Sequence, residues 1–171
     1  MRFDVAVNTI LMHEGNYVWD SNDPGGETRF GISKRSFPNE NIKDLSLERA
    51  KEIYKKYYWN ACRCDDIPDW AVLIVFDCAV NQGVARAVAY AQKTLIVPVD
   101  GVLGPITIKA WHSIDYMDFL EEYAKLRLNS YTRLPHWKYY GAGWAKRLLD
   151  IVLRSFRYAG DSPGVPINTR A

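Results

Sequence analysis

The chain has 171 residues, which suits one compact domain and is enough to bury a core without disulfides or metals. Its apolar and charged fractions, 48% and 25%, are those of an ordinary globular protein and exclude a disordered or collagen-like chain. The net charge of +2 excludes the strongly basic balance of a dedicated nucleic-acid-binding protein.

The N-terminal third predicts two helices separated by a turn-rich segment. Apolar residues at helical spacing indicate a first helix over residues 3–14. Residues 15–31 are dense in glycine, asparagine, aspartate and proline, which predicts turns and a short β-hairpin. Ser46 is a typical N-cap, so we expect a second helix to begin there and to run to about Trp59.

The rest of the chain is predicted to be helical around one very apolar segment. Pro68 at a first helical position indicates a helix that ends before Gly83. Residues 70–76 are apolar nearly all round, so this helix should be central and buried, although the run is too short to span a bilayer. Further helices are expected over residues 84–95, 105–111, 116–132 and 143–157. The elements together predict a mostly α fold, a helical bundle around a buried central helix with a small β-hairpin near the N-terminus.

Charge and cysteine content bear on the partners and the compartment. Residues 124–158 hold eight Lys/Arg and one acid, Asp150, which is typical either of a segment that meets an anionic surface or of a solvated helix face. Three cysteines do not make a disulfide framework, so we expect a reducing compartment. Asp4 and Asn8 interrupt the N-terminal apolar run, and we therefore expect synthesis in the cytoplasm without a signal peptide.

Glu14 is the strongest candidate for a catalytic residue. It follows Ile10 and Leu11 at a spacing that places all three on one face of the first helix, so its carboxyl projects from an apolar surface. Partial removal from water favours the protonated form of a carboxylic acid, which a general acid requires. An ordinary glutamate at a helix end fits the same local pattern.

The turn after Glu14 contains residues that can act with it. If a hairpin folds back over the first helix, Asp23 and Thr28 can face Glu14 across a cleft. Two carboxyl groups, one protonated and one ionised, are the minimum for hydrolysis of a sugar bond. Asp23 also suits a plain turn, and Asp20 and Glu27 compete with it for the second role.

Several residues are candidates for sugar binding. Asn81, at the end of the buried helix, can bind an acetamido or hydroxyl group, or it can satisfy backbone groups at the helix end. Aromatic residues make up 13% of the chain, and some of them can stack on sugar faces rather than only fill the core. The aromatic candidates are Tyr17, Phe30, Trp137, Tyr139 and Tyr140.

Metal-dependent and cysteine-dependent chemistry are disfavoured by the same reading. Tyr17 stands where the second histidine of a zinc-protease motif beginning at His13 should be. Cys78 lies within the apolar helix, and Cys62 and Cys64 precede an acidic turn that would raise a thiol pKa. We therefore expect no metal and no organic cofactor.

Several segments in order along the chain resemble glycoside hydrolase family 108, whose members are phage and bacterial N-acetylmuramidases. Together they extend over nearly all of residues 3–158, and several spaced motifs are more specific than any one of them. The segments are HEGNY (13–17), NDPGGETRFGIS (22–33), FDCAVNQG (76–83), QKTL (92–95) with DGVLGPIT (100–107), and GWAKR (143–147).

The resemblance implies a lysozyme-like endolysin that hydrolyses the β-1,4 bond between N-acetylmuramic acid and N-acetylglucosamine in peptidoglycan. It implies that Glu14 is the catalytic acid. The order Glu14, Asp23, Thr28 also resembles the triad of phage-type lysozymes, with one residue fewer before the threonine. Such a protein acts on the cell wall after release by another protein, and nothing requires more than a monomer.

The resemblance also divides the chain and leaves alternatives open. We expect residues 1–95 to form the catalytic region, residues 96–158 to pack on it and help hold the glycan, and residues 159–171 to be a flexible tail. Lys146 stands where the family has asparagine. The alternatives are a lytic transglycosylase, a non-catalytic wall-binding protein, or a membrane-permeabilising protein acting through the basic amphipathic helix at 143–157.

Overall fold

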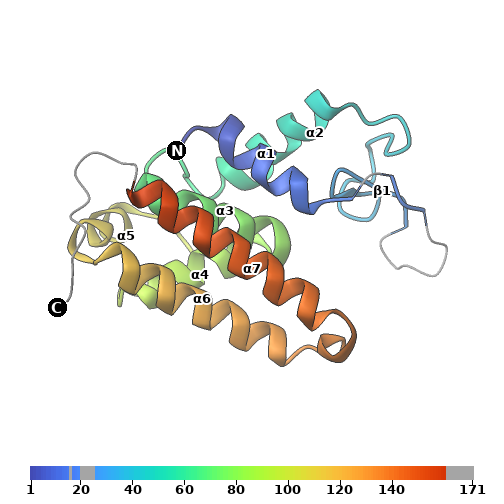
Figure 1. The fold of residues 1–171 in the computed structure, drawn as a ribbon. Helices are drawn as coiled ribbons and strands as arrows, with labels where there is room; N and C mark the ends of the chain where they lie inside the picture. The colour runs from blue at the N-terminus through green and yellow to red at the C-terminus, as the bar shows by residue number, and fades with distance from the viewer. Residues whose placement is uncertain (16, 20–25, 161–171) are drawn as a thin grey trace.

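A computed structural model describes residues 1–15, 17–19 and 26–160 of the chain. The described part is a bundle of helices with a small β-hairpin at one end (Figure 1), which confirms the predicted mostly α fold. The tail was predicted over residues 159–171; residues 159 and 160 are the end of the last helix, and residues 161–171 lie outside the described residues. None of the described helices is long and apolar enough to cross a membrane.

The bundle is built around α3 (Asp69–Gln82), as the apolar run predicted. Every residue from Trp70 to Ala79 is buried, including one charged residue, Asp77. Pro68 is the extended N-cap residue rather than the first helical one, so the helix begins one residue later than expected. Gly83, with φ +92°, ends it because only glycine adopts that backbone conformation without strain.

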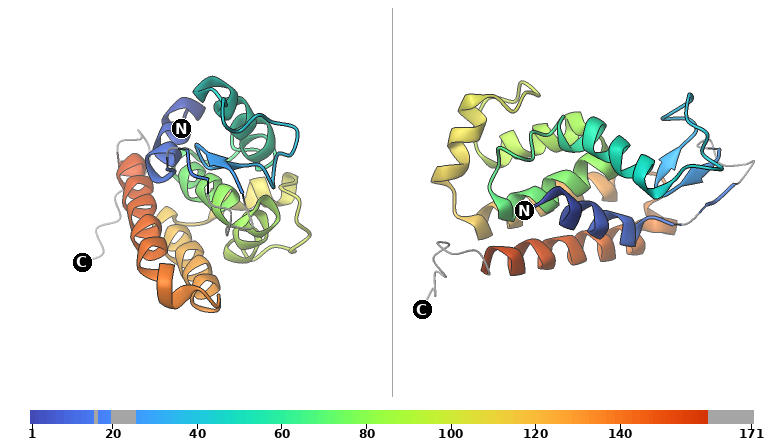
Figure 2. Two further views of the ribbon diagram at one scale, coloured as in Figure 1. Left: turned by 90° about the vertical axis from the view of Figure 1, so that its right-hand side faces the viewer. Right: turned by 90° about the horizontal axis from the view of Figure 1, so that it is seen from above.

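Among the described elements, four α-helices contact α3 and cover it on different sides (Figures 1 and 2). The long C-terminal α7 runs beside α6, and both lie against α3. The predicted division of the chain near residue 95, between a catalytic region and a region that packs on it, stays a prediction. The four helices are α1 (Phe3–His13), α4 (Val84–Thr94), α6 (Tyr116–Thr132) and α7 (Trp137–Gly160).

The β-hairpin lies beyond the C-terminal end of α1. Strands β1 (Thr28–Arg29) and β2 (Ile32–Ser33) pair antiparallel, with Arg29 opposite Ile32. The two residues between them, Phe30 and Gly31, both have positive φ, which is the backbone of a tight type I′ turn. Val18 adds an isolated bridge to Thr28.

The second helix also differs in detail from its prediction. Ser46 is the N-cap of α2 (Leu47–Tyr54), and its hydroxyl accepts a hydrogen bond from the Arg49 backbone N–H at 3.1 Å. From Lys55 to Trp59 the chain continues as one wide π-helical turn, η1. The predicted span to Trp59 is therefore helical throughout but not α-helical throughout.

α7 begins six residues earlier than the predicted helix over 143–157. Glycine is unfavourable in the interior of a helix, and Gly141 lies within the added stretch. In the structure, a Cβ added to Gly141 would lie 2.5 Å from the indole ring of Trp137, one turn earlier. Glycine is thus retained within the helix because the ring occupies the space of a side chain.

A buried glutamine organises the loop between α4 and the short α5 (Pro105–Ala110), which continues as the 3₁₀ turn η2 (Trp111–Ser113). The Gln92 amide nitrogen donates to Asp100 Oδ1 at 2.6 Å and to the Val102 carbonyl at 2.9 Å. Its carbonyl oxygen accepts from the Gly101 N–H at 2.9 Å. One side chain therefore holds the whole turn against α4.

We predict that Gln92→Met lowers the free energy of unfolding by about 1–3 kcal/mol, because it removes these bonds while nearly preserving volume. Urea unfolding of both proteins measures the change. Lys93→Met, at the neighbouring exposed position of α4, is the control and should change stability by less than about 0.5 kcal/mol. Equal effects of the two substitutions would contradict the role given to Gln92.

Candidate active site

Glu14 lies where the chain leaves α1. It is the C-cap residue, with extended backbone (φ −93°, ψ 135°), and its N–H donates to the Leu11 carbonyl. The side chain is 18% exposed. The apolar face of α1 faces the core, with Ile10 buried, and the carboxyl stands at the edge of the hydrophobic interior. The helix predicted over 3–14 ends at His13, so the backbone of Glu14 does not continue its helical spacing.

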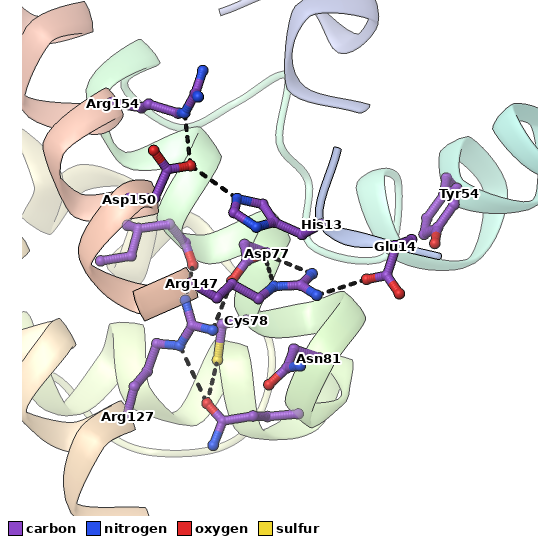
Figure 3. A network of polar contacts seen from close by, with 12 residues as sticks. His13, Glu14, Tyr54, Asp77, Cys78, Asn81, Arg127, Arg147, Asp150 and Arg154 are labelled. Carbon is purple, nitrogen blue, oxygen red and sulfur yellow. Dashed lines mark hydrogen bonds and ion pairs between the residues drawn. The ribbon is translucent and has the colours of Figure 1, made fainter. Parts of the chain in front are cut away.

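One oxygen of the Glu14 carboxyl is held by Arg147 of α7. Arg147 Nη1 donates to Glu14 Oε1 at 2.7 Å, and Arg147 Nε donates to Asp77 Oδ1 at 2.9 Å (Figure 3). Burial lowers the pKa of Arg147, but the two carboxylates, Asp77 most strongly, raise it above its usual value. Arg147 is therefore a fixed cation that joins Glu14 to the core.

Asp77 also contacts a second arginine, Arg127. Its other oxygen, Oδ2, accepts from Arg127 Nη2 of α6 at 2.7 Å, and both side chains are fully buried. Arg127 also donates to the Tyr131 hydroxyl at 3.0 Å. Burial lowers the pKa of Arg127, but Asp77 together with the side chains around it raises that pKa above its usual value. Because each buried charge has an opposite partner, the network avoids the cost of an isolated ion.

The other oxygen of Glu14 lies against the turn of the hairpin. A Cβ added to Gly31 would be 2.7 Å from Glu14 Oε2 and 2.5 Å from the Tyr54 hydroxyl. That hydroxyl donates to the Phe30 carbonyl at 2.8 Å, which fixes the turn. Burial, with a contribution from the Glu14 carboxylate, raises the pKa of Tyr54. Among the residues described, Oε2 has no hydrogen-bond partner, in contrast to Oε1.

Asn81 is connected to the same network from the end of α3. The Tyr131 hydroxyl, which accepts from Arg127, donates to Asn81 Oδ1 at 2.6 Å. The amide is thereby oriented by a side chain and not by the backbone of the helix end. Asn81 itself is exposed, so its NH₂ group can donate to a ligand.

A groove of about 580 Å³ lies beside this network, on the face formed by α7 and the ends of α1 and α3. Arg147 contributes to its wall. On one side, His13 Nε2 and Asp150 Oδ2 are 2.9 Å apart, and Asp150 also accepts from Arg154 at 2.8 Å. The groove is lined by His13, Asn81, Trp144, Lys146, Arg147 and Asp150.

The other predicted catalytic residues have different outcomes. Asp23 and Asp20 lie outside the described residues. Thr28 is half-buried in β1, opposite Ser33 and two residues before the turn that contacts Glu14. Glu27 accepts a hydrogen bond from the Tyr17 hydroxyl at 3.1 Å.

The predicted aromatic binding residues occupy three places. Tyr17 is 40% exposed beside the hairpin and bonded to Glu27. Phe30 packs partly against the core, with the Arg29 guanidinium 5.3 Å from its ring centre. Tyr140 is 59% exposed, and the centre of its ring lies 6.1 Å from that of Trp144, which is on the wall of the groove. Trp137 and Tyr139 lie in the same first turns of α7.

Sequence reasoning missed the charged residues that position Glu14. Arg147 was noticed only as part of the GWAKR segment, and Asp77 only as part of FDCAVNQG. A charged residue within a run as apolar as α3 was a usable signal, since a buried carboxylate needs a cation from elsewhere. The sequence did not identify the cations, because Arg127 and Arg147 lie 50 and 70 residues away from Asp77 along the chain.

The cysteines do not form a nucleophilic or metal site. All three are free and buried, and burial raises the pKa of Cys62 to about 12 and that of Cys78 above its usual value. A thiol with a raised pKa is a poor nucleophile at neutral pH. Across residues 1–15, 17–19 and 26–160, no group of three or more His, Cys, Asp or Glu side chains could hold a metal ion.

We predict that Gly31→Ala destabilises the protein more than Gly26→Ala. Both glycines have similar positive φ, +74° and +66°, so alanine costs about 1–2 kcal/mol at either position through the backbone alone. Only at Gly31 does the new methyl group meet Glu14 and Tyr54; at Gly26 nothing lies within 4 Å. Urea unfolding of the two variants measures the difference, and equal losses would show that the close approach is unimportant.

Comparison with known proteins places this geometry in a family. The sequence profile described as Glycosyl hydrolase 108 matches residues 7–83. A solved structure described as "Structure of Brucella abortus SagA" matches with a TM-score of 0.87 and 30% sequence identity, covering 94% of this chain and 97% of that chain. No curated protein sequence matches. The chain belongs to the glycosyl hydrolase 108 family and is a glycoside hydrolase.

Proposed function

We propose that this glycoside hydrolase cleaves peptidoglycan at the β-1,4 bond between N-acetylmuramic acid and N-acetylglucosamine, with Glu14 as the general acid. The observation that carries the proposal is the asymmetric environment of the Glu14 carboxyl. Arg147 holds Oε1 at 2.7 Å, whereas Oε2 has no hydrogen-bond partner in the described part of the chain. Family membership and the motifs that resemble muramidases support the choice of substrate.

In this mechanism, Oε2 of Glu14 carries the proton and delivers it to the glycosidic oxygen as the C1–O bond breaks. Arg147 orients the carboxyl by holding the other oxygen, and Asp77 in turn orients Arg147. A carboxyl group with one oxygen held presents its second oxygen in one direction, which limits the misalignment that reduces the rate of proton transfer.

The second catalytic group in the proposal is Asp23, chosen from its place in the sequence. An ionised carboxylate there would stabilise positive charge on the sugar ring. With Thr28 it would position the attacking water, and the product would have inverted configuration at C1. Asp20 and Glu27 are the competing choices, and Glu27 already accepts a hydrogen bond from Tyr17.

The basic segment at 124–158 is proposed to draw the enzyme to anionic cell envelopes after its release. Four of its eight cations already have carboxylate partners in the structure, so only part of the charge faces outward. The paired residues are Lys125, Arg127, Arg147 and Arg154. The attraction we propose therefore depends on Arg133, Lys138, Lys146 and Arg157.

One observation favours a second candidate function, membrane permeabilisation. A largely apolar groove of about 600 Å³ lies between α6 and α7, and it leaves Leu149, Leu153 and Phe156 between 44% and 58% exposed. An exposed apolar helix face with cationic residues nearby can insert at a lipid surface. Such an activity would not need Glu14, so one substitution separates the two functions.

We predict that Glu14→Gln lowers hydrolysis of purified peptidoglycan by at least about a hundredfold, because an amide cannot donate the proton. Mass spectrometry of the digest measures it: wild type should release fragments with reducing muramic ends, and the variant should release almost none. Circular dichroism checks that the variant is folded.

Other outcomes of that digest identify the alternatives. Anhydro ends, lighter by one water, would make the enzyme a lytic transglycosylase that still uses Glu14. Cleavage retained by folded Glu14→Gln would refute Glu14 as the acid. Lysis of cells without cleavage of purified peptidoglycan would favour the membrane function, and vesicle leakage would then test it.

A further prediction concerns Arg147. Arg147→Met should lower kcat about ten- to hundredfold, because Glu14 loses the contact that orients it. It should also lower the free energy of unfolding by about 1.5–3 kcal/mol, because Asp77 loses one of its two cations. Steady-state kinetics and urea unfolding measure the two effects. Arg157→Met removes the same charge from an exposed position of the same helix. It should leave kcat and the free energy of unfolding nearly unchanged, because the attraction proposed for Arg157 acts on association and not on turnover.

A further inference from the structure

The groove beside Glu14 contains one cation whose charge the protein does not use. Lys146 is exposed on α7, and among the residues that the structure describes it has no ion-pair or hydrogen-bond partner. Asp150, one helical turn later, is the natural partner, but its Oδ2 accepts from His13 at 2.9 Å and from Arg154 at 2.8 Å. Lys146 is therefore available to a ligand.

The other cation of the groove is not available. The Arg147 guanidinium is 12% exposed and is shared between Glu14 and Asp77. The two acids on the groove side of the network are likewise occupied, Glu14 by Arg147 and Asp150 by His13 and Arg154. The free charge presented to a molecule in the groove is thus the single positive charge of Lys146.

The remaining walls of the groove suit a sugar. Asn81 has its carbonyl oxygen engaged by Tyr131 at 2.6 Å, so the amide presents its NH₂ group as a donor. Trp144 is half-buried and offers an aromatic surface of the kind that stacks on a sugar ring. A donor, an aromatic surface and one cation together fit a sugar that carries an acetyl carbonyl and an anionic substituent.

The two sugars of peptidoglycan differ in this respect. N-Acetylglucosamine is neutral, whereas N-acetylmuramic acid bears a lactyl ether that ends in a carboxyl group. That group is a free carboxylate where no stem peptide is attached, and elsewhere it is joined to a peptide that has carboxylates of its own. An anionic substituent therefore distinguishes the muramoyl residue from its neighbours along the strand.

We propose that the groove is the subsite for the muramoyl residue, and that Lys146 selects this residue by binding its carboxylate. The inference rests on the proposed function and deepens it, because it assigns to one residue the distinction between the two sugars. Lys146 is a binding residue in this proposal and takes no part in proton transfer. Glycans without carboxylates should still be cleaved, but without the benefit of Lys146.

Three soluble glycan substrates test the proposal. The first is strands that keep their stem peptides after the cross-links are cut. The second is strands stripped by an amidase, which leaves the lactyl carboxylate free. The third is the stripped strands after carbodiimide coupling to methylamine, which turns the carboxylate into a neutral amide.

Lys146→Gln should lower kcat/KM about three- to tenfold on at least one of the two charged substrates, mainly through KM, and should leave the neutral substrate unchanged. Added salt should reduce the difference. Lys146→Arg should retain most of the activity. Lys109→Gln, the same change at an exposed position of α5 outside the groove, is the matched control.

The substrates also identify the source of the carboxylate. A loss confined to the stripped strands assigns it to the lactyl group, and a loss confined to the stem-bearing strands assigns it to the peptide. An equal loss on all three substrates, or no loss on any, overturns the proposal while leaving the muramidase assignment intact.

A binding measurement separates the failure of this proposal from the failure of the proposed function. Calorimetric titration of Glu14→Gln with the same three substrates needs no turnover. If the double variant Glu14→Gln/Lys146→Gln binds the two charged substrates more weakly than Glu14→Gln does, and the neutral substrate equally well, the subsite is supported even if wild type cleaves nothing. Unchanged binding by the double variant overturns it.

Discussion

The structure depends on a row of alternating charges that joins four helices. Glu14 at the end of α1 contacts Arg147 of α7, which contacts Asp77 of α3, which contacts Arg127 of α6. Burying any one of these charges alone would cost several kcal/mol, so each requires its neighbour. The same contacts that compensate the buried charges therefore fix the Glu14 carboxyl relative to helices drawn from the whole chain. The geometry of the candidate site and the stability of the fold therefore depend on the same side chains.

The hairpin completes the environment of Glu14 through its backbone. Phe30 and Gly31 both adopt positive φ. Glu14 Oε2 and the Tyr54 hydroxyl lie so close to Gly31 that they occupy the space where a Cβ atom of that residue would be. The family match contains this turn, the second half of α1 and all of α3, but the arginine that holds Oε1 comes from α7, outside the matched residues. A site defined by the matched segment alone would lack the arginine that contacts Glu14.

Part of the positive charge in the C-terminal third is paired inside the protein. The segment at 124–158 is basic in sequence, yet Arg127 and Arg147 are internal ions with structural partners. The charge left for outside partners is smaller and more localised than the composition suggests. Lys146 is notable in that setting because its nearest acid along the helix, Asp150, is engaged by His13 and Arg154.

The sequence by itself determined the elements that depend on local chemistry: the span of α6, the Ser46 N-cap, the end of α3 at Gly83 and the apolar central helix. It also singled out Glu14 as a candidate, although the structure places that residue at the C-cap, just outside the helix. Local rules failed at α7, where Gly141 is explained only by the ring of Trp137 packed over it. Only the tertiary structure decided which cation holds Glu14 and how Asn81 is oriented. Those contacts join residues 50 to 133 positions apart, and no pattern along the chain encodes a distance across a packed core.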